Sequence, residues 1–141
     1  MIIATLKEIL PGENRVALTP SSVKDLTKAG LTVHIESGSG IESNYSDKDY
    51  EDAGAFIASI SDIYQNADIL VKVATPTLDE ISQMKDGSIF TSFFQTTKEL
   101  DAVKALMDKK VTGFSMHLIP RTTLAQKMDA LSSQANIAGY K

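Results

Sequence analysis

Short apolar runs alternate with helical segments along the chain, and this alternation constrains the fold more than any other feature. Runs rich in β-branched and aromatic residues predict strands at 2–6, 32–35, 55–57, 69–73, 88–93 and 111–116. Capping residues and helical periodicity predict helices at 22–29, 47–53, 62–66, 78–84, 97–109 and from 125 onward. Because strands separated by helices form right-handed βαβ crossovers, the sequence predicts a three-layer α/β fold, with helices on both faces of a mostly parallel sheet.

The composition narrows the class of protein further. The 141 residues carry 14 basic and 18 acidic side chains, and this acidic balance argues against a general nucleic-acid binder. Because cysteine is absent, disulfides, thiolate zinc sites and cysteine nucleophiles are excluded. The apolar runs are too short to span a bilayer, and no linker divides the chain. We therefore expect residues 1–141 to form one soluble, intracellular domain.

The last segment favours a chain that is cut inside a longer protein. From residue 125 onward, one side of the predicted helix is apolar and carries Met128, Leu131, Ala135 and Ala138. The sequence then stops at 139–141, with no packing element after this helix. A helix end at Gly139 is the alternative, since glycine commonly ends helices.

Two cationic side chains are candidates for binding an anion. Arg15 follows the first predicted strand, and ligands of open parallel sheets gather at the carboxyl ends of strands. The alternative for Arg15 is a solvated loop with surface ion pairs. Lys72 lies within the apolar run 69–73, so it must either lie near the strand end or bear the cost of burying its charge. The alternative for Lys72 is an edge strand from which the side chain reaches water.

Two other features carry weaker signals. The turn at 37–40 (SGSG) follows a strand but lacks the third glycine and the clear helix start of a dinucleotide fingerprint. His34 and His117 are far apart in sequence, and each alternates with apolar neighbours in a predicted strand. Without cysteine and without paired histidine spacing, we expect no metal site.

A polar segment follows the last predicted strand. Arg121 and residues 126–134 (QKMDALSSQ) place a guanidinium, amides, a carboxylate and hydroxyls within a short stretch, which can orient an uncharged polar group such as a carboxamide. No histidine neighbours Ser132 or Ser133, so an activated serine nucleophile is not expected. The alternative is an ordinary helical N-terminus with Asp129 near the positive end of the helix dipole.

These same segments resemble those of a known family. Residues 13–20 (ENRVALTP) resemble the N-terminal signature shared by alanine dehydrogenases and nicotinamide nucleotide transhydrogenases. Residues 38–40 (GSG), with Asp47, Tyr50 and 53–55 (AGA), resemble the family's next block, and Lys72-Val73 resembles its apolar strand with a lysine. Residues 128–141 (MDALSSQANIAGYK) are similar to the transhydrogenase α subunit and not to alanine dehydrogenase.

The resemblance implies a flavodoxin-like or Rossmann-like domain, the first of two that are separated by a cleft. The second domain, expected after residue 141, would carry the glycine-rich fingerprint and bind most of NAD(H). Hydride would pass from NADH to NADP⁺ on another component, coupled to proton translocation at the cytoplasmic face of the inner membrane. The implied partners are the rest of the α subunit, the NADP-binding and membrane components, and a second copy in a homodimer; neither nucleic acid nor metal is implied.

The resemblance also implies roles for single residues. Arg121, Gln126, Asp129 and Ser132 match catalytic and cofactor-binding residues of a loop over the nicotinamide. Alanine dehydrogenases resemble the chain at Arg15 and Lys72, but they carry a catalytic histidine where this chain has Phe94. A phenylalanine cannot transfer a proton, which argues against deamination. The alternatives to a transhydrogenase are an alanine dehydrogenase-like domain and a non-catalytic nucleotide-binding or interaction module.

Overall fold

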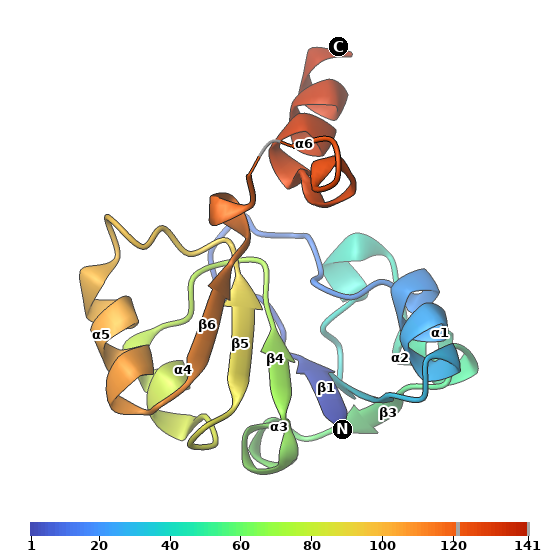
Figure 1. Ribbon diagram of the computed structural model, residues 1–141. Coiled ribbons are helices and arrows are strands. Elements are labelled where there is room, and N and C mark those ends of the chain that lie inside the picture. Colours follow the sequence, from blue (N-terminus) through green and yellow to red (C-terminus); the bar gives the residue numbers. More distant parts are fainter. Residues whose placement is uncertain (121, 141) are drawn as a thin grey trace.

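Six parallel strands form one sheet in the part of the chain that the structure describes, residues 1–120 and 122–140 apart from the side chain of Leu131. In this computed structural model, the strand order is β3-β2-β1-β4-β5-β6, and every pairing is parallel (Figure 1). The strands are β1 (Ile2–Thr5), β2 (Thr32–Glu36), β3 (Phe56–Ala58), β4 (Ile69–Val71), β5 (Ile89–Ser92) and β6 (Thr112–Ser115). The predicted α/β class is confirmed.

The helices begin at side chains that accept hydrogen bonds from the first helical turn. Thr19, Ser46, Ser59 and Thr77 cap four of them in this way. The helices are α1 (Pro20–Lys28), α2 (Asp47–Asp52), α3 (Ile60–Asn66), α4 (Leu78–Gln83), α5 (Leu100–Asp108) and α6 (Ala130–Gly139). Short 3₁₀ turns occur at Ile41–Ser43, Met116–Leu118 and Gln126–Met128. The first helix therefore begins at Pro20 and not at the predicted residue 22, because Thr19 caps it and proline fits the first turn.

The two faces of the sheet have separate apolar cores. On one face, Val23 of α1 and Tyr50 of α2 pack against Ile3, Val33 and Ile35. On the other face, the buried side chains of α3, α4 and α5 pack against alternate residues of β1, β4 and β5. This division follows from handedness, since right-handed crossovers in opposite directions from β1 place their helices on opposite faces.

Two expectations about local structure are wrong. β4 ends at Val71, so Lys72 lies just past the strand, and β4 is a central strand, so Lys72 is not an edge-strand side chain that reaches water. β6 ends at Ser115, and His117 lies in the 3₁₀ turn that follows it, not in a strand.

The last helix differs from the other five. A 3₁₀ turn at Gln126–Met128 and a cap at Asp129 delay the start of α6 to Ala130, although helical spacing predicted a helix from 125. α6 extends away from the sheet (Figure 1). Met128, Ala135 and Ala138 of the predicted apolar side are exposed, so these residues are not covered by the described chain. Within the described residues, no helix is long and apolar enough to cross a membrane.

Candidate functional site

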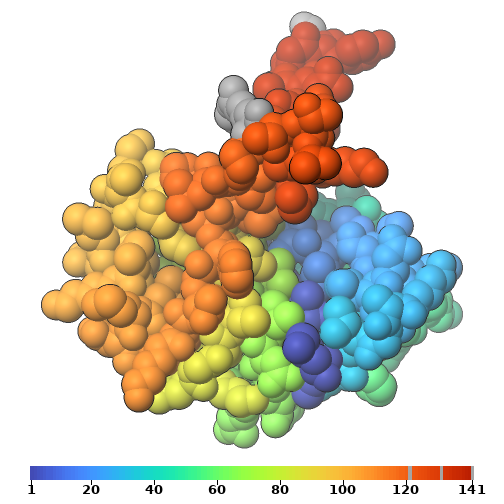
Figure 2. Space-filling model, in the orientation of Figure 1, coloured from blue at the N-terminus to red at the C-terminus, as the bar shows by residue number. Residues whose placement is uncertain are grey.

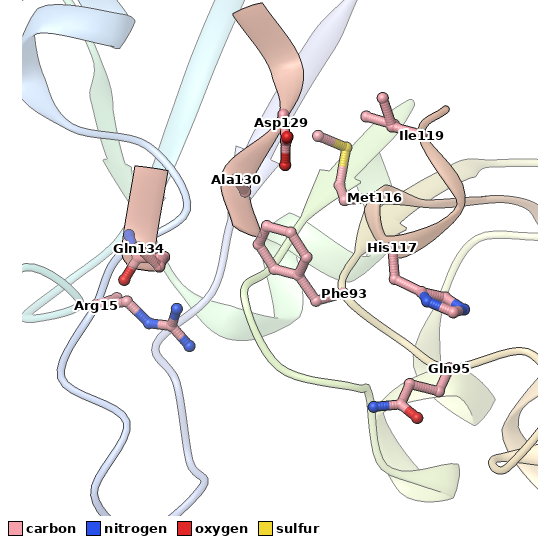
Figure 3. A pocket seen from close by; sticks show the side chains of 9 residues that line it. All are labelled: Arg15, Phe93, Gln95, Met116, His117, Ile119, Asp129, Ala130 and Gln134. Carbon is pink, nitrogen blue, oxygen red and sulfur yellow. The ribbon is translucent and has the colours of Figure 1, made fainter. Parts of the chain in front are cut away.

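A two-lobed cleft, here called the edge cleft, lies at the carboxyl edge of the sheet. The strand order reverses at β1, whose next neighbour on one side is β2 and on the other β4. Ligands of open α/β sheets bind outside the carboxyl ends of strands at such a reversal. The outer lobe has a volume of about 500 Å³ and is shown in Figure 3. The inner lobe, about 270 Å³, shares five lining residues with it: Arg15, Phe93, Met116, Ala130 and Gln134.

The inner lobe reaches down to the ends of β4 and β5. Val71 and Thr91 line it from these strands, and Lys72 and Val73 line it from the segment after β4. Arg15 lines it from the loop after β1. The structure thus brings together Arg15 and Lys72, which are far apart in sequence. Their proposed role in anion binding stays a prediction.

Lys72 is the centre of a buried ionic cluster. Its Nζ lies 2.5 Å from Glu80 Oε1 and 3.9 Å from Glu8 Oε2. The Lys72 side chain is 1% exposed, and that of Glu8 is 4% exposed. Glu80 also accepts a hydrogen bond from the backbone N–H of Thr77, and thereby completes the capping box of α4. One carboxylate therefore holds both the lysine and the start of the helix.

Glu8 joins the first strand's loop to the segment after β4. Its carboxylate accepts hydrogen bonds from the backbone N–H groups of Val73, at 2.6 Å, and Ala74, at 3.3 Å. Burial raises the pKa of Glu8 above its ordinary value, and these N–H groups and Lys72 oppose the shift. The cluster fixes the wall of the inner lobe at the reversal of strand order.

Arg15 is held by a neighbouring carboxylate. Its Nε and Nη2 donate to the two oxygens of Glu13 at 2.7 and 2.6 Å, which is a bidentate pair. The pair lowers the pKa of Glu13 and raises that of Arg15. The Arg15 side chain remains 51% exposed. Arg15 therefore makes the surface ion pair expected of a solvated loop and also lines the edge cleft.

Five residues of the outer lobe were not predicted from the sequence as site residues: Phe93, Gln95, Met116, His117 and Ile119. Phe93 and Met116 directly follow β5 and β6, and their position at strand ends was the available signal. Phe94, expected at the place of the alanine dehydrogenase histidine, is buried and contacts Phe90, with ring centroids 6.2 Å apart. Phe93 therefore supplies the ring that faces the cleft, as Figure 3 shows.

The segment after β6 brings three of the predicted site residues together. Gln126 and Asp129 line a hollow of about 230 Å³ together with Thr122 and Thr123. Asp129 caps α6: Ser132 donates to it from its backbone N–H, at 3.1 Å, and from its hydroxyl, at 2.6 Å. The alternative interpretation of Asp129, as a residue at an ordinary helix N-terminus, therefore agrees with its position as the cap of α6. Arg121 lies outside the described residues.

Asp129 also connects this hollow to the edge cleft. It lines both the hollow and the outer lobe, where Ala130 and Gln134 of α6 are its neighbours (Figure 3). A carboxylate and an amide near one another provide both acceptors and donors for a planar amide group. Among the described residues, no group of three or more histidine, aspartate or glutamate side chains is arranged to hold a metal ion.

Known transhydrogenases and alanine dehydrogenases are similar to this chain. The chain is 40% identical to the NAD(P) transhydrogenase subunit alpha of Haemophilus influenzae over all its residues, and it spans 27% of that relative's length. It matches the crystal structure of transhydrogenase from Sinorhizobium meliloti with a TM-score of 0.95, at 40% identity, over 99% of this chain and 42% of the other. An L-alanine dehydrogenase structure is less similar, with a TM-score of 0.76 at 33% identity over 82% of this chain and 32% of the other.

The family assignment rests on sequence and structure together. The family model for the alanine dehydrogenase/PNT N-terminal domain matches residues 4–138, and the transhydrogenase structure covers nearly all of the same chain. The parallel sheet and the cleft at its reversal agree with the resemblance seen in the motifs. The chain belongs to the alanine dehydrogenase/PNT N-terminal domain family.

Proposed function

We propose that this chain is the first domain of the NAD(H)-binding component of a proton-translocating transhydrogenase. The observation that carries the proposal is the likeness to transhydrogenase over nearly the whole chain, which exceeds the likeness to alanine dehydrogenase. The site geometry supports it, because Gln126 and Asp129 line one hollow beside the edge cleft.

The side chains of the hollow fit the nicotinamide carboxamide in chemistry. When bound, NAD(H) supplies the hydride that the reaction transfers. The Gln126 amide can both donate and accept, and the Asp129 carboxylate accepts from an N–H. Together they would fix the carboxamide and so the orientation of the ring, which is what hydride transfer requires of the protein. No general base is needed on this side.

The other predicted residues would support Asp129. Ser132 donates two hydrogen bonds to its carboxylate, which holds that side chain at the start of α6. We expect Arg121 to stabilise Asp129 as an anion or to anchor polar groups of the dinucleotide. Arg15 and Lys72 remain candidates for holding an anionic group in the inner lobe.

The proposal extends to the whole protein. We expect a second Rossmann-like domain with the glycine-rich fingerprint after residue 141, an NADP(H)-binding component, and membrane components at the cytoplasmic face of the inner membrane. We also expect a homodimer and no metal. The fraction of the Haemophilus influenzae subunit that the chain spans, 27%, leaves room for such further domains.

Separate measurement of hydride transfer and binding in the complete enzyme tests the proposal. Asp129→Asn and Gln126→Asn should each slow hydride transfer, by roughly 100-fold, since small misalignments of reacting groups have effects of that order. NADH affinity should change little, because most of the dinucleotide is bound elsewhere. Lys127→Ala, in the same 3₁₀ turn but outside the lining of the hollow, is the matched control. Equal losses in stopped-flow rate and in NADH binding would contradict a role in ring alignment.

One observation keeps an alanine dehydrogenase-like activity as the second candidate. His117 lines the outer lobe, so an imidazole is present in the edge cleft although Phe94 is buried in the core. Pyruvate- and ammonium-dependent oxidation of NADH by the complete protein, lost in His117→Gln, would support that activity. NADH binding without either reaction would indicate a non-catalytic module.

A further inference from the structure

Two large apolar side chains line the edge cleft and belong to neither apolar core. Phe93 and Met116 line both lobes of the cleft, and both are only half-buried. Neither is a member of the cores on the two faces of the sheet. We call this pair the apolar shelf. Apolar side chains in a concave site, with a few polar groups around them, are typical of a site that binds a small molecule.

The sheet fixes the two side chains of the apolar shelf next to one another. Ser92 of β5 pairs with Ser115 of β6, so Phe93 and Met116 directly follow paired residues of adjacent strands. The Ser115 hydroxyl donates to the Phe94 carbonyl at 2.5 Å and ties the two segments together. Ser92 and Phe94 are 1% and 3% exposed, and because successive side chains of an extended chain alternate, the Phe93 ring points the other way, into the cleft (Figure 3).

Polar side chains lie above the apolar shelf, in the segment that follows β6. Figure 2 shows residues 122–129, in deep orange, above the carboxyl edge of the sheet, with α6 projecting beyond them. This segment carries Gln126 and Asp129, which line the hollow. Asp129 also lines the outer lobe, together with Phe93 and Met116. The cleft therefore has amide and carboxylate groups on one side and an apolar surface on another.

A planar ring that carries an amide group fits this arrangement. The volume of the outer lobe, about 500 Å³, is within the range of small-molecule sites. A phenylalanine ring packs well against another ring, and it attracts a cationic ring over its face. The thioether of a methionine makes favourable contacts with the edge of a ring. Phe93 and Met116 are thus suited to the ring of a nicotinamide, as the hollow is to its carboxamide.

We propose that the nicotinamide ring packs against Phe93 and Met116 while its carboxamide is held in the hollow. This proposal rests on the proposed function and adds to it the residues that recognise the ring itself. A ring held only at its carboxamide could still rotate about the bond to that group. Contact with the apolar shelf removes this freedom, and alignment of the ring is what hydride transfer requires of the protein.

Binding of NAD⁺ and of ADP-ribose to the complete protein tests the proposal without using activity. ADP-ribose is the matched ligand, because it has a hydroxyl group where NAD⁺ has the nicotinamide. Phe93→Leu keeps an apolar side chain and removes the aromatic ring, so it should weaken NAD⁺ binding by roughly 2- to 10-fold and leave ADP-ribose binding unchanged. Phe56→Ala, at a phenylalanine that is 61% exposed on the edge strand β3, is the control and should change neither affinity.

A second measurement uses the unaltered shelf. In complete protein labelled with [methyl-¹³C]methionine, Met116→Leu identifies the Met116 methyl signal by its loss. NAD⁺ should shift this signal, because an aromatic ring beside a methyl group changes its resonance, and ADP-ribose should leave it in place. Met107, which is 68% exposed on α5, is the internal reference and should not shift with either ligand. This measurement decides the question even if Phe93→Leu does not fold.

The outcomes separate the apolar shelf from the proposed function. An unchanged ratio of NAD⁺ to ADP-ribose affinity in Phe93→Leu would overturn the shelf alone. So would NAD⁺ binding that leaves the Met116 signal unmoved, or a shift with ADP-ribose as large as that with NAD⁺. Failure of the complete protein to bind either ligand would overturn the shelf and the proposed function together.

Discussion

Replacement of Lys72 by methionine isolates the buried ionic cluster that holds the wall of the inner lobe. The substitution keeps most of the apolar stem and removes the charge that lies 2.5 Å from Glu80 and 3.9 Å from Glu8. At an effective dielectric constant of about 20, two unit charges 3.9 Å apart interact by about 4 kcal/mol. Removal of one partner from a buried ion pair costs about 3–5 kcal/mol, because the remaining charges stay buried. We expect the free energy of unfolding to fall by about that amount.

The loss of stability caused by Lys72→Met should depend on pH in a defined direction. Burial raises the folded-state pKa of Glu8 above 4.5, so the folded protein binds this proton more strongly than the unfolded chain. The favourable contribution of Glu8 to the free energy of unfolding is present at pH values below 4.5 and is lost as the pH rises through the folded-state pKa of Glu8. Lys72 opposes that shift, and its removal raises the pKa of Glu8 further. Lys72→Met should therefore destabilise more at pH 8 than at pH 5.

Urea unfolding followed by circular dichroism at both pH values measures these differences. Addition of Glu80→Gln to Lys72→Met should recover part of the stability, since one uncompensated carboxylate is removed. Lys85→Met is the control: its ion pair with Asp68 is 3.0 Å long, but both side chains are more than 40% exposed, so a loss below about 1 kcal/mol is expected. Losses of equal size for the two lysines, or a Lys72→Met loss that shrinks as the pH rises, would refute the reasoning.

Three further predictions concern the core and the cofactor. Gly40→Ala should lower the free energy of unfolding by roughly 1–3 kcal/mol, because the new Cβ would lie 2.6 Å from Tyr50 Cε2. Gly139→Ala is the control and should not destabilise, since nothing lies within 4 Å of its new Cβ. Thermal unfolding compares the two variants. Tyr50→Phe should lower the free energy of unfolding by about 1–3 kcal/mol, since the Tyr50 hydroxyl donates to the buried Leu18 carbonyl at 2.9 Å. Burial raises the pKa of this hydroxyl to about 12. An unchanged midpoint in urea unfolding would contradict the prediction. Residues 1–141 alone should bind NADH more weakly than micromolar, which titration calorimetry checks.

Element types were predictable because their signals are local. The β-branched runs and the capping residues specify strands and helix starts within a few positions, and the structure places an element at each predicted range. Element ends were less predictable where distant contacts set them. α5 begins at Leu100 and not at 97, because the Glu99 carboxylate accepts hydrogen bonds from the backbone of Gln95 and from Thr75, which is 24 residues away. A sequence window cannot show that contact.

Candidate site residues also divide into those that have a local signal in the sequence and those whose environment is set by distant contacts. Arg15, Lys72, Gln126 and Asp129 could be singled out because charged or amide side chains near strand ends are unusual enough to notice. The environment of Lys72 could not be predicted, since the strand order decides that it is central and faces two carboxylates. Apolar lining such as Phe93 gives only a weak signal, its position at a strand end, because a phenylalanine after a strand is as common in a core as in a cleft.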